Sequence, residues 1–182
     1  MNKYDINHLN GLLLIATHKV GFDPLFSSSL VFITKHDVNI GAEGIIINKP
    51  TKLPFYKLFH MVDSDIAINL SKQVLEENMV LIGGPELVKS TSVIEDDLSH
   101  KVLTETLLES IVSRSDTTRF EVAAGIATWQ PGQLEREVFN DFWIPAACDK
   151  EVMFKEPYDT RYEKLVNKLD LSNYLNRLIS NE

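Results

Sequence analysis

Short runs of apolar residues recur along the chain, each bounded by glycine, proline or polar residues, and each predicts a buried strand. Five of them are Leu12–Ala16, Leu30–Ile33, Ile45–Ile47, Met79–Ile82 and Phe120–Ala127. Two further segments are Ser92–Glu95, expected as an edge strand, and Phe142–Pro145, expected as an extended segment that ends at its proline. The pattern therefore predicts a substantial sheet.

The second and third runs predict a hairpin of neighbouring antiparallel strands. Gly41 and Gly44 are expected to frame its turn before Ile45. Proline cannot donate a hydrogen bond to a strand ladder, so Asn48-Lys49-Pro50 is expected to close the third strand. The segment Thr17–Ser29, which joins the first two strands, predicts an irregular loop with one helical turn.

Apolar residues at helical spacing predict helices between and after the strands. The expected helices span 55–62, 103–112, 132–140 and 158–169, with a polar loop over 63–78 and a weaker helical tail over 171–182. Asp149 has a side chain suited to cap a turn that carries Val152, Met153 and Phe154.

The order of these elements indicates the fold class. Strands dominate the first half of the chain and alternate with helices in the second, which favours an α+β domain with one mixed sheet over a regular doubly wound fold. The 182 residues contain no internal repeat, low-complexity tract or linker. A single domain over residues 1–182 is therefore expected.

Charge and cysteine content narrow the classes of function. With 26 acidic and 18 basic residues, the formal net charge is −8, which repels phosphate backbones, so direct nucleic-acid binding is not expected. The single Cys148 excludes an intramolecular disulfide and fits a reducing compartment. Leu12–Ala16 is too short to span a membrane, and no basic signal region precedes it. We expect a cytoplasmic protein without membrane contact.

Five stretches, taken together and in order, resemble those of the YqgE/AlgH family, and the resemblance spans nearly all of the chain. They are Leu13–Ala16, Asp23-Pro24 followed by Phe26, Gly41–Pro50, Ile82–Pro85 and Gly125–Glu135. The resemblance implies an α+β fold in which a large mixed sheet folds on itself toward a barrel, with helices outside. It implies no established activity, although some members carry a transcriptional-regulator label.

The sequence departs from the family pattern at three places. Ser28 replaces the arginine usual after the Asp-Pro motif, and Thr17-His18 replaces a Met-Pro pair. The Arg-Gly-Phe stretch that usually follows Gly-Gly-Pro is missing from Glu86–Ile94. A function that requires a cationic group at these positions is not expected of this chain.

Gly83-Gly84-Pro85 follows a buried strand and admits two interpretations. Glycines let backbone N–H groups approach an anion closely, as in phosphate-binding loops. The segment lacks the lysine and hydroxyl residue of a P-loop and the spacing of a dinucleotide fingerprint, and its proline removes one donor. A structural turn is therefore favoured over a phosphate site.

The turn that begins at Trp129 is the second candidate. A tryptophan between a strand and a helix fits a core position, an aromatic wall for a ligand, or an anchor for a protein partner. Asn48 ends another strand and is expected at the same sheet edge. The candidate ligand or partner surface comprises Asn48, Gly83, Gly84, Pro85, Trp129, Pro131, Gly132, Gln133 and Glu135.

Other reactive residues favour structural roles. Glu135 lies in the first turn of its helix, where a carboxylate complements the helix dipole, and Glu137 is expected to point in a different direction. Asp149 next to Cys148 disfavours the thiolate. The five histidines lack the spacing of a zinc site. No catalytic residue, metal site or cofactor is expected.

The sequence thus favours a non-enzymatic regulatory or protein-interaction role, with an unknown protein partner at the surface near Trp129 and Gly83-Gly84-Pro85. The label of transcriptional regulator comes from the family resemblance alone. The alternative is a small-molecule or nucleotide binder, or an enzyme acting on such a molecule, with its site at the same sheet edge.

Overall fold

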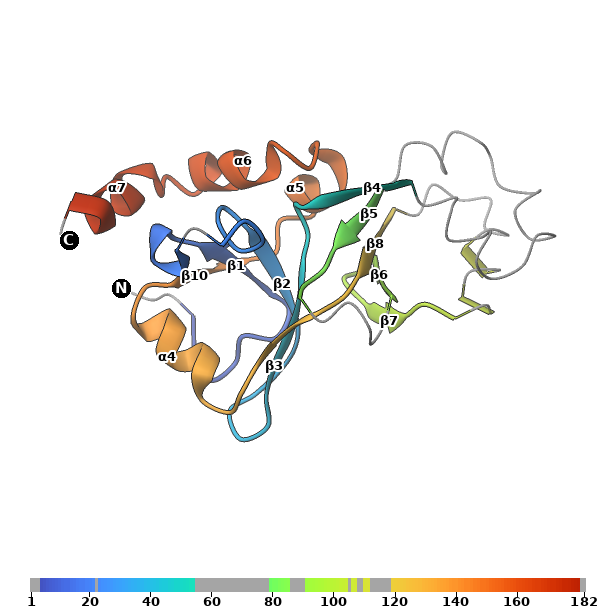
Figure 1. Cartoon of the computed structure of the whole chain (residues 1–182), viewed down its shortest axis with the longest axis horizontal. Helices are drawn as coiled ribbons and strands as arrows, with labels where there is room; N and C mark the ends of the chain where they lie inside the picture. Colours follow the sequence, from blue (N-terminus) through green and yellow to red (C-terminus); the bar gives the residue numbers. More distant parts are fainter. Residues whose placement is uncertain are drawn as a thin grey trace.

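The computed structural model describes residues 4–21, 23–54, 79–85, 91–104, 106–107, 110–111 and 119–180. Within these ranges, the strands form two five-stranded sheets with helices beside them (Figure 1). The predicted α+β class is confirmed. The strands are divided between two sheets, however, and no closed barrel forms in the described part of the chain.

The first sheet is antiparallel throughout and has the order β10-β1-β2-β3-β9. Its strands are β1 (Leu12–Ala16), β2 (Leu30–Asp37), β3 (Gly41–Ile46), β9 (Ala127–Trp129) and β10 (Trp143–Ala147). The loop between β1 and β2 contains one 3-10 turn, η1 (His18–Val20), as the sequence predicts.

The second sheet has the order β4-β5-β8-β6-β7, in which β5 and β8 are parallel and the other pairs antiparallel. Its strands are β4 (Pro50–Pro54), β5 (Met79–Ile82), β6 (Thr91–Glu95), β7 (His100–Val102) and β8 (Phe120–Ala124).

Helices cover both faces of the first sheet. Helix α4 (Gln133–Phe139) lies on one face, and α5 (Lys150–Lys155) and α6 (Arg161–Lys168) lie on the other, continued by α7 (Ser172–Ser180) (Figure 1). The Asp149 carboxylate accepts the Glu151 and Val152 N–H groups, which confirms the predicted cap. No helix in the described ranges is long and apolar enough to cross a membrane.

Strand β1 shows why its sequence is apolar at every position. Leu13 and Ile15 face the cluster that includes Met153 and Leu165 of α5 and α6. Leu14 and Ala16 face the cluster that includes Leu134 and Val138 of α4. Because successive side chains of a strand point to opposite faces, a strand covered on both sides needs an uninterrupted apolar run.

The chain crosses between the two sheets twice, from β3 to β4 and from β8 to β9, and both crossings lie against the end of β5. The Ile46 N–H donates to the Gly83 carbonyl, and the Ile82 N–H donates to the Lys49 carbonyl, both at 2.8 Å. A Cβ on Gly84 would lie 2.1 Å from the carbonyl carbon of Ile126. The two glycines therefore let the backbone of β5 lie directly on the β8–β9 crossing.

Helix α6 is held at this junction by a buried ion pair. Arg161 donates from Nη2 to Glu121 of β8 at 2.5 Å and from Nη1 to the Ile47 carbonyl at 2.6 Å. Its guanidinium also lies 4.3 Å from the centre of the Tyr158 ring. Burial raises the pKa of Glu121 to about 7, although the adjacent Arg161 acts in the opposite direction.

Several strand boundaries were predicted wrongly. Polar residues after Ile33 continue β2 to Asp37, so the turn lies at residues 38–40 and Gly44 is inside β3, against the Val31 side chain. The run Phe120–Ala127 is broken at Gly125, whose φ of +86° ends β8 and redirects the chain into the first sheet.

Three other expectations changed because of strand neighbours. Pro50 opens β4, at the first position of a strand, where its missing N–H is tolerated. The run Ser92–Glu95 is not an edge, because His100–Val102 forms a further strand outside it. Strand β10 continues through Pro145 to Ala147, which is possible because β10 is itself an edge of the first sheet.

The predicted helices 132–140 and 158–169 are confirmed as α4 and α6, and α7 occupies most of the predicted tail. Within the predicted helix 103–112, the described residues 106–107 and 110–111 are helical. The expected helix 55–62 and loop 63–78 lie outside the described residues, as do Glu86 to Ser90 of the segment that departs from the family pattern.

Replacing Gly84 by alanine tests the junction. The added Cβ meets backbone atoms, which cannot rotate away, so we expect Gly84→Ala to lower the free energy of unfolding by about 3 kcal/mol or more in urea denaturation. The control is Gly11→Ala, where a Cβ meets nothing within 4 Å and only a φ of +77° opposes it, at about 1 kcal/mol. Equal losses in the two variants would contradict the close packing.

The Glu121 carboxyl gives the folded protein a specific pH dependence. Its folded pKa of about 7 exceeds the ordinary 4.5, so its contribution to stability is full below pH 4.5 and is lost as the pH rises through 7. Between pH 5 and pH 8, we expect the free energy of unfolding of the wild type to fall by at most about 3 kcal/mol relative to that of Glu121→Gln, measured by urea denaturation. A difference that stays constant with pH would show that Glu121 is ionised throughout.

Candidate functional site

The predicted site residues fall into two groups. Asn48, Gly83 and Gly84 are buried where the sheets meet, and Pro85 is exposed beside them. Residues 129–135 follow at the other end of β9, which is about 7 Å long. The structure therefore connects the two groups through the backbone of residues 126–129.

Asn48 holds the loop that precedes β2. Its Oδ1 accepts the Leu30 N–H, and its Nδ2 donates to the Ser28 carbonyl, both at 2.8 Å. Ser28 itself has a φ of +52°. The neighbouring Lys49 donates from Nζ to the Ser27 carbonyl at 2.8 Å, and partial burial lowers its pKa. These bonds give Asn48 a structural role, because they hold residues 27–29 in their conformation.

The Gly83-Gly84 turn is filled by the protein's own backbone. The Gly83 N–H donates to the Ala124 carbonyl at 2.8 Å. The side of Gly83 on which a side chain would lie faces the Gly125 carbonyl, and the same side of Gly84 faces the backbone of Ile126. The Gly83 N–H, which a phosphate would need, is thus occupied by a backbone contact.

Glu137 joins both tryptophans of the chain. Its Oε2 accepts the indole N–H of Trp129 at 2.9 Å and that of Trp143 at 2.8 Å, while its Oε1 accepts from Nε2 of Gln133 at 2.9 Å. The two indole rings meet edge to face, with centroids 6.1 Å apart. Hydrogen bonds to a carboxylate are stronger than neutral ones, so this cluster fixes α4 on the first sheet.

The turn before α4 is explained by its local bonds. Gly132 precedes the helix with a φ of +70°, and the Gln130 N–H donates to Oε1 of Gln133 at 3.0 Å. Pro131 is exposed between them. Trp129 is buried, in the core position that was one of its three predicted roles.

Glu135 points away from Glu137, as predicted, and contacts His36. The Leu9 N–H donates to Nδ1 of His36 at 3.2 Å, so the ring proton lies on Nε2, which donates to Glu135 at 3.0 Å. This contact joins the N-terminal segment, β2 and α4. Asp23, of the Asp-Pro motif, accepts the Leu25 N–H within its own loop.

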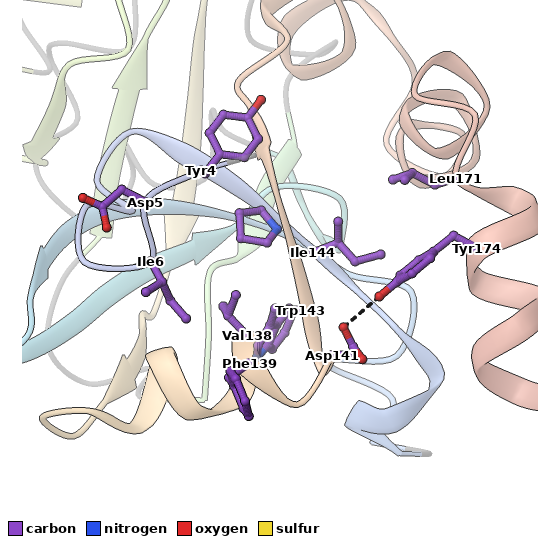
Figure 2. A pocket seen from close by; sticks show the side chains of 11 residues that line it. Tyr4, Asp5, Ile6, Val138, Phe139, Asp141, Trp143, Ile144, Leu171 and Tyr174 are labelled. Atoms are coloured by element: carbon purple, nitrogen blue, oxygen red, sulfur yellow. Dashed lines mark hydrogen bonds between the residues drawn. The ribbon is translucent and has the colours of Figure 1, made fainter. Parts of the chain in front are cut away.

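An open cavity of about 630 Å³ lies between the N-terminal segment, the end of α4, β10 and α7 (Figure 2). Its aromatic lining residues are Tyr4, Phe139, Trp143 and Tyr174. Of the described residues that line it, Asp5 and Asp141 are the charged ones. Phe139 is unusual for a phenylalanine, since its side chain is 80% exposed.

Sequence reasoning missed this cavity because its walls come from four distant segments. It also missed Glu137 as the acceptor of both indoles, although Glu137 is four residues after Gln133 and hence on the same helix face. The pair Arg161–Glu121 carried no sequence signal, because 40 positions separate its members.

The surroundings of Ser92 and Cys148 disfavour nucleophilic reactivity. Ser92 and His100 form a hydrogen bond of 3.1 Å across β6 and β7, but Ser92 is fully buried, out of reach of a substrate. Burial, and then the neighbouring Asp149, raise the pKa of the Cys148 thiol to about 11. Its sulfur lies 3.6 Å from that of Met153.

In the described ranges no group of three potential ligands is placed to hold a metal ion.

Sequence comparisons match this chain to one family. The profile of the AlgH-like family, DUF179, matches residues 13–173. A UPF0301 protein of Buchnera aphidicola is 31% identical over 167 residues, which cover 84% of this chain and 86% of the relative. A UPF0301 protein of Actinobacillus pleuropneumoniae is 29% identical over 185 residues, which cover 94% and 97% of the two chains.

Two solved structures share the fold. The solution structure of the AlgH protein from Pseudomonas aeruginosa aligns with a TM-score of 0.70 at 21% identity and covers 97% of each chain. The crystal structure of protein DIP2367 from Corynebacterium diphtheriae aligns with a TM-score of 0.65 at 17% identity, over 92% of this chain and 90% of that one. Together with the family profile and the relatives, these findings show that the chain belongs to the AlgH-like family.

Proposed function

We propose that this protein is a cytosolic, non-enzymatic regulatory protein that acts by binding a protein partner, and that the partner contacts the outer surface of α4. The surface extends from Pro131 and Gln133 at the start of the helix to Phe139 at its end. The observation that carries this proposal is the exposed ring of Phe139. Burying such a ring in a complex contributes about 1.5–3 kcal/mol.

A fixed backbone makes the exposed ring an effective anchor. Leu134 and Val138 bury the inner face of α4, and the Glu137 carboxylate bonds two indoles. A side chain on an immobile helix loses little entropy when it binds, and aromatic residues of this kind dominate the energies of many protein interfaces. Trp129 thus supports the proposed surface from beneath.

The chemistry of the described residues favours binding over catalysis. Glu135, Glu137 and Glu121 are each committed to a structural partner. The small-molecule or nucleotide alternative near Gly83 to Pro85 is less well supported, because strand contacts occupy the glycine N–H and the space beside it. The regulatory role would proceed through proteins and not through DNA, since the net charge of −8 repels phosphates.

The unit that acts is proposed to be the whole chain as one domain. The chain passes twice between the two sheets, and α6 bonds to the junction and to β1. Each sheet therefore depends on the other for its position.

The half-buried thiol of Cys148 fits the reducing conditions of the cytosol.

Replacing Phe139 tests the surface directly. Because the ring is exposed, we expect Phe139→Ala to change the free energy of unfolding by less than about 0.5 kcal/mol. The same variant should lose at least about tenfold in recovery of partners in a cross-linking pull-down read by mass spectrometry.

Val102→Ala is the matched control, because this exposed apolar residue lies on β7 of the second sheet. It should recover the same partners as wild type. Undiminished capture by Phe139→Ala, or equal losses in both variants, would rule out the α4 surface as the binding site.

The Glu137 cluster should determine the rigidity of that surface. We expect Glu137→Ala to lower the free energy of unfolding by about 2 kcal/mol, because three donors lose a charged acceptor, and to alter tryptophan fluorescence. Glu137→Gln keeps the shape and should lose less. Unchanged fluorescence and stability in Glu137→Ala would contradict the role of this carboxylate.

A further inference from the structure

The cavity beside Phe139 combines aromatic walls with negative charge. Figure 2 shows Asp5 on its N-terminal side and Asp141 on the side of α7, with Phe139 and Trp143 between them. Both carboxylates reach solvent, since the Asp5 side chain is 58% exposed and that of Asp141 is 39% exposed. The charged residues that line the cavity are thus both acidic, in keeping with the net charge of −8 of the chain.

The bonds that each carboxylate makes leave room for a cation. The Asp141 Oδ1 accepts from the Tyr174 hydroxyl at 2.8 Å, and Oδ2 forms a long ion pair with the ammonium of Lys19, at 3.8 Å and without a hydrogen bond. Lys19 donates instead to the Asn140 carbonyl at 3.1 Å. The Asp5 Oδ1 accepts from the backbone and the side-chain amide of Asn7, and its Oδ2 accepts from the exposed His8 ring.

The adjacent sheet edge is closed to an added strand. Pro145 lies within β10, the edge strand, and has no N–H to offer. The Ala147 N–H already donates to the Tyr4 hydroxyl at 2.9 Å. A partner that binds here must therefore be recognised by its side chains, and not by extension of the sheet.

We infer that the protein partner inserts a lysine or arginine side chain, next to an apolar residue, into the cavity formed by Tyr4, Asp5, Phe139, Asp141 and Tyr174. This inference rests on the proposed binding of a partner at α4 and adds the partner's chemistry. The apolar stem of the basic residue packs on the rings, and its charge lies near the carboxylates. The acidic chain also steers a basic partner toward it and repels an acidic or phosphorylated one.

Selection from a random peptide library on phage tests this inference, because the selection does not require an identified partner. The full-length protein is the bait, and peptides are counter-selected on Phe139→Ala. We expect the enriched peptides to pair lysine or arginine with a leucine or aromatic residue. Peptides that depend on Phe139 but lack basic residues would overturn this inference and leave the proposed function standing. A lack of Phe139-dependent peptides would overturn both.

Affinity measurements on one enriched peptide test the role of the two acids. Replacing its arginine by citrulline, which is neutral and similar in shape, should weaken binding about tenfold, and so should Asp5→Asn with Asp141→Asn. Asparagine suits position 141, because its φ is +61°. Either change without effect on affinity would overturn the inference.

The matched control variant is Asp97→Asn with Asp170→Asn, which removes the same charge outside the cavity. Asp97 accepts a backbone N–H two residues on, as Asp5 does, and Asp170 has a positive φ, as Asp141 does. We expect this variant to keep the wild-type affinity. An equal loss in the control would show that net charge alone attracts the peptide, and would overturn the cavity site.

Discussion

Arg161 constrains the arrangement of the whole structure. Its buried guanidinium donates to the Ile47 carbonyl between the sheets, to Glu121 in the second sheet and, from Nε, to the Glu156 carbonyl. A cation removed from water is tolerated only where its donors are satisfied, so α6 has one acceptable position. The Tyr162 hydroxyl of the same helix donates to the Ala16 carbonyl at 2.7 Å and fixes the first sheet relative to that position.

The opposite face of the first sheet is completed by a second polar contact. Glu137 accepts both indole N–H groups, so aromatic packing and charge act together to hold α4 in place. The inner face of the helix is buried in this way, and the helix presents Phe139 to solvent. The buried contacts of Glu137 thus position the outer surface of α4, because a binding surface is held in place by the residues that pack beneath it.

Membership of the AlgH-like family explains the fold, while the proposed function depends on side chains that the fold only positions. The cavity at β10 is bounded by the two ends of the chain, and Pro145 prevents its edge from recruiting a further strand. Its acids and aromatic rings favour a basic partner. A regulatory role through protein contact fits this surface better than contact with DNA.

The sequence by itself determined the local features. It predicted the buried run of β1, the helix after Gly132 and the Asp149 cap, because each depends on residues within about one turn or one strand. Only the tertiary structure decided which sheet each strand joins and which charges meet. Gly125 divides one apolar run between two sheets, and Glu121 finds a partner 40 positions away. Such choices depend on contacts between distant segments, which no local pattern encodes.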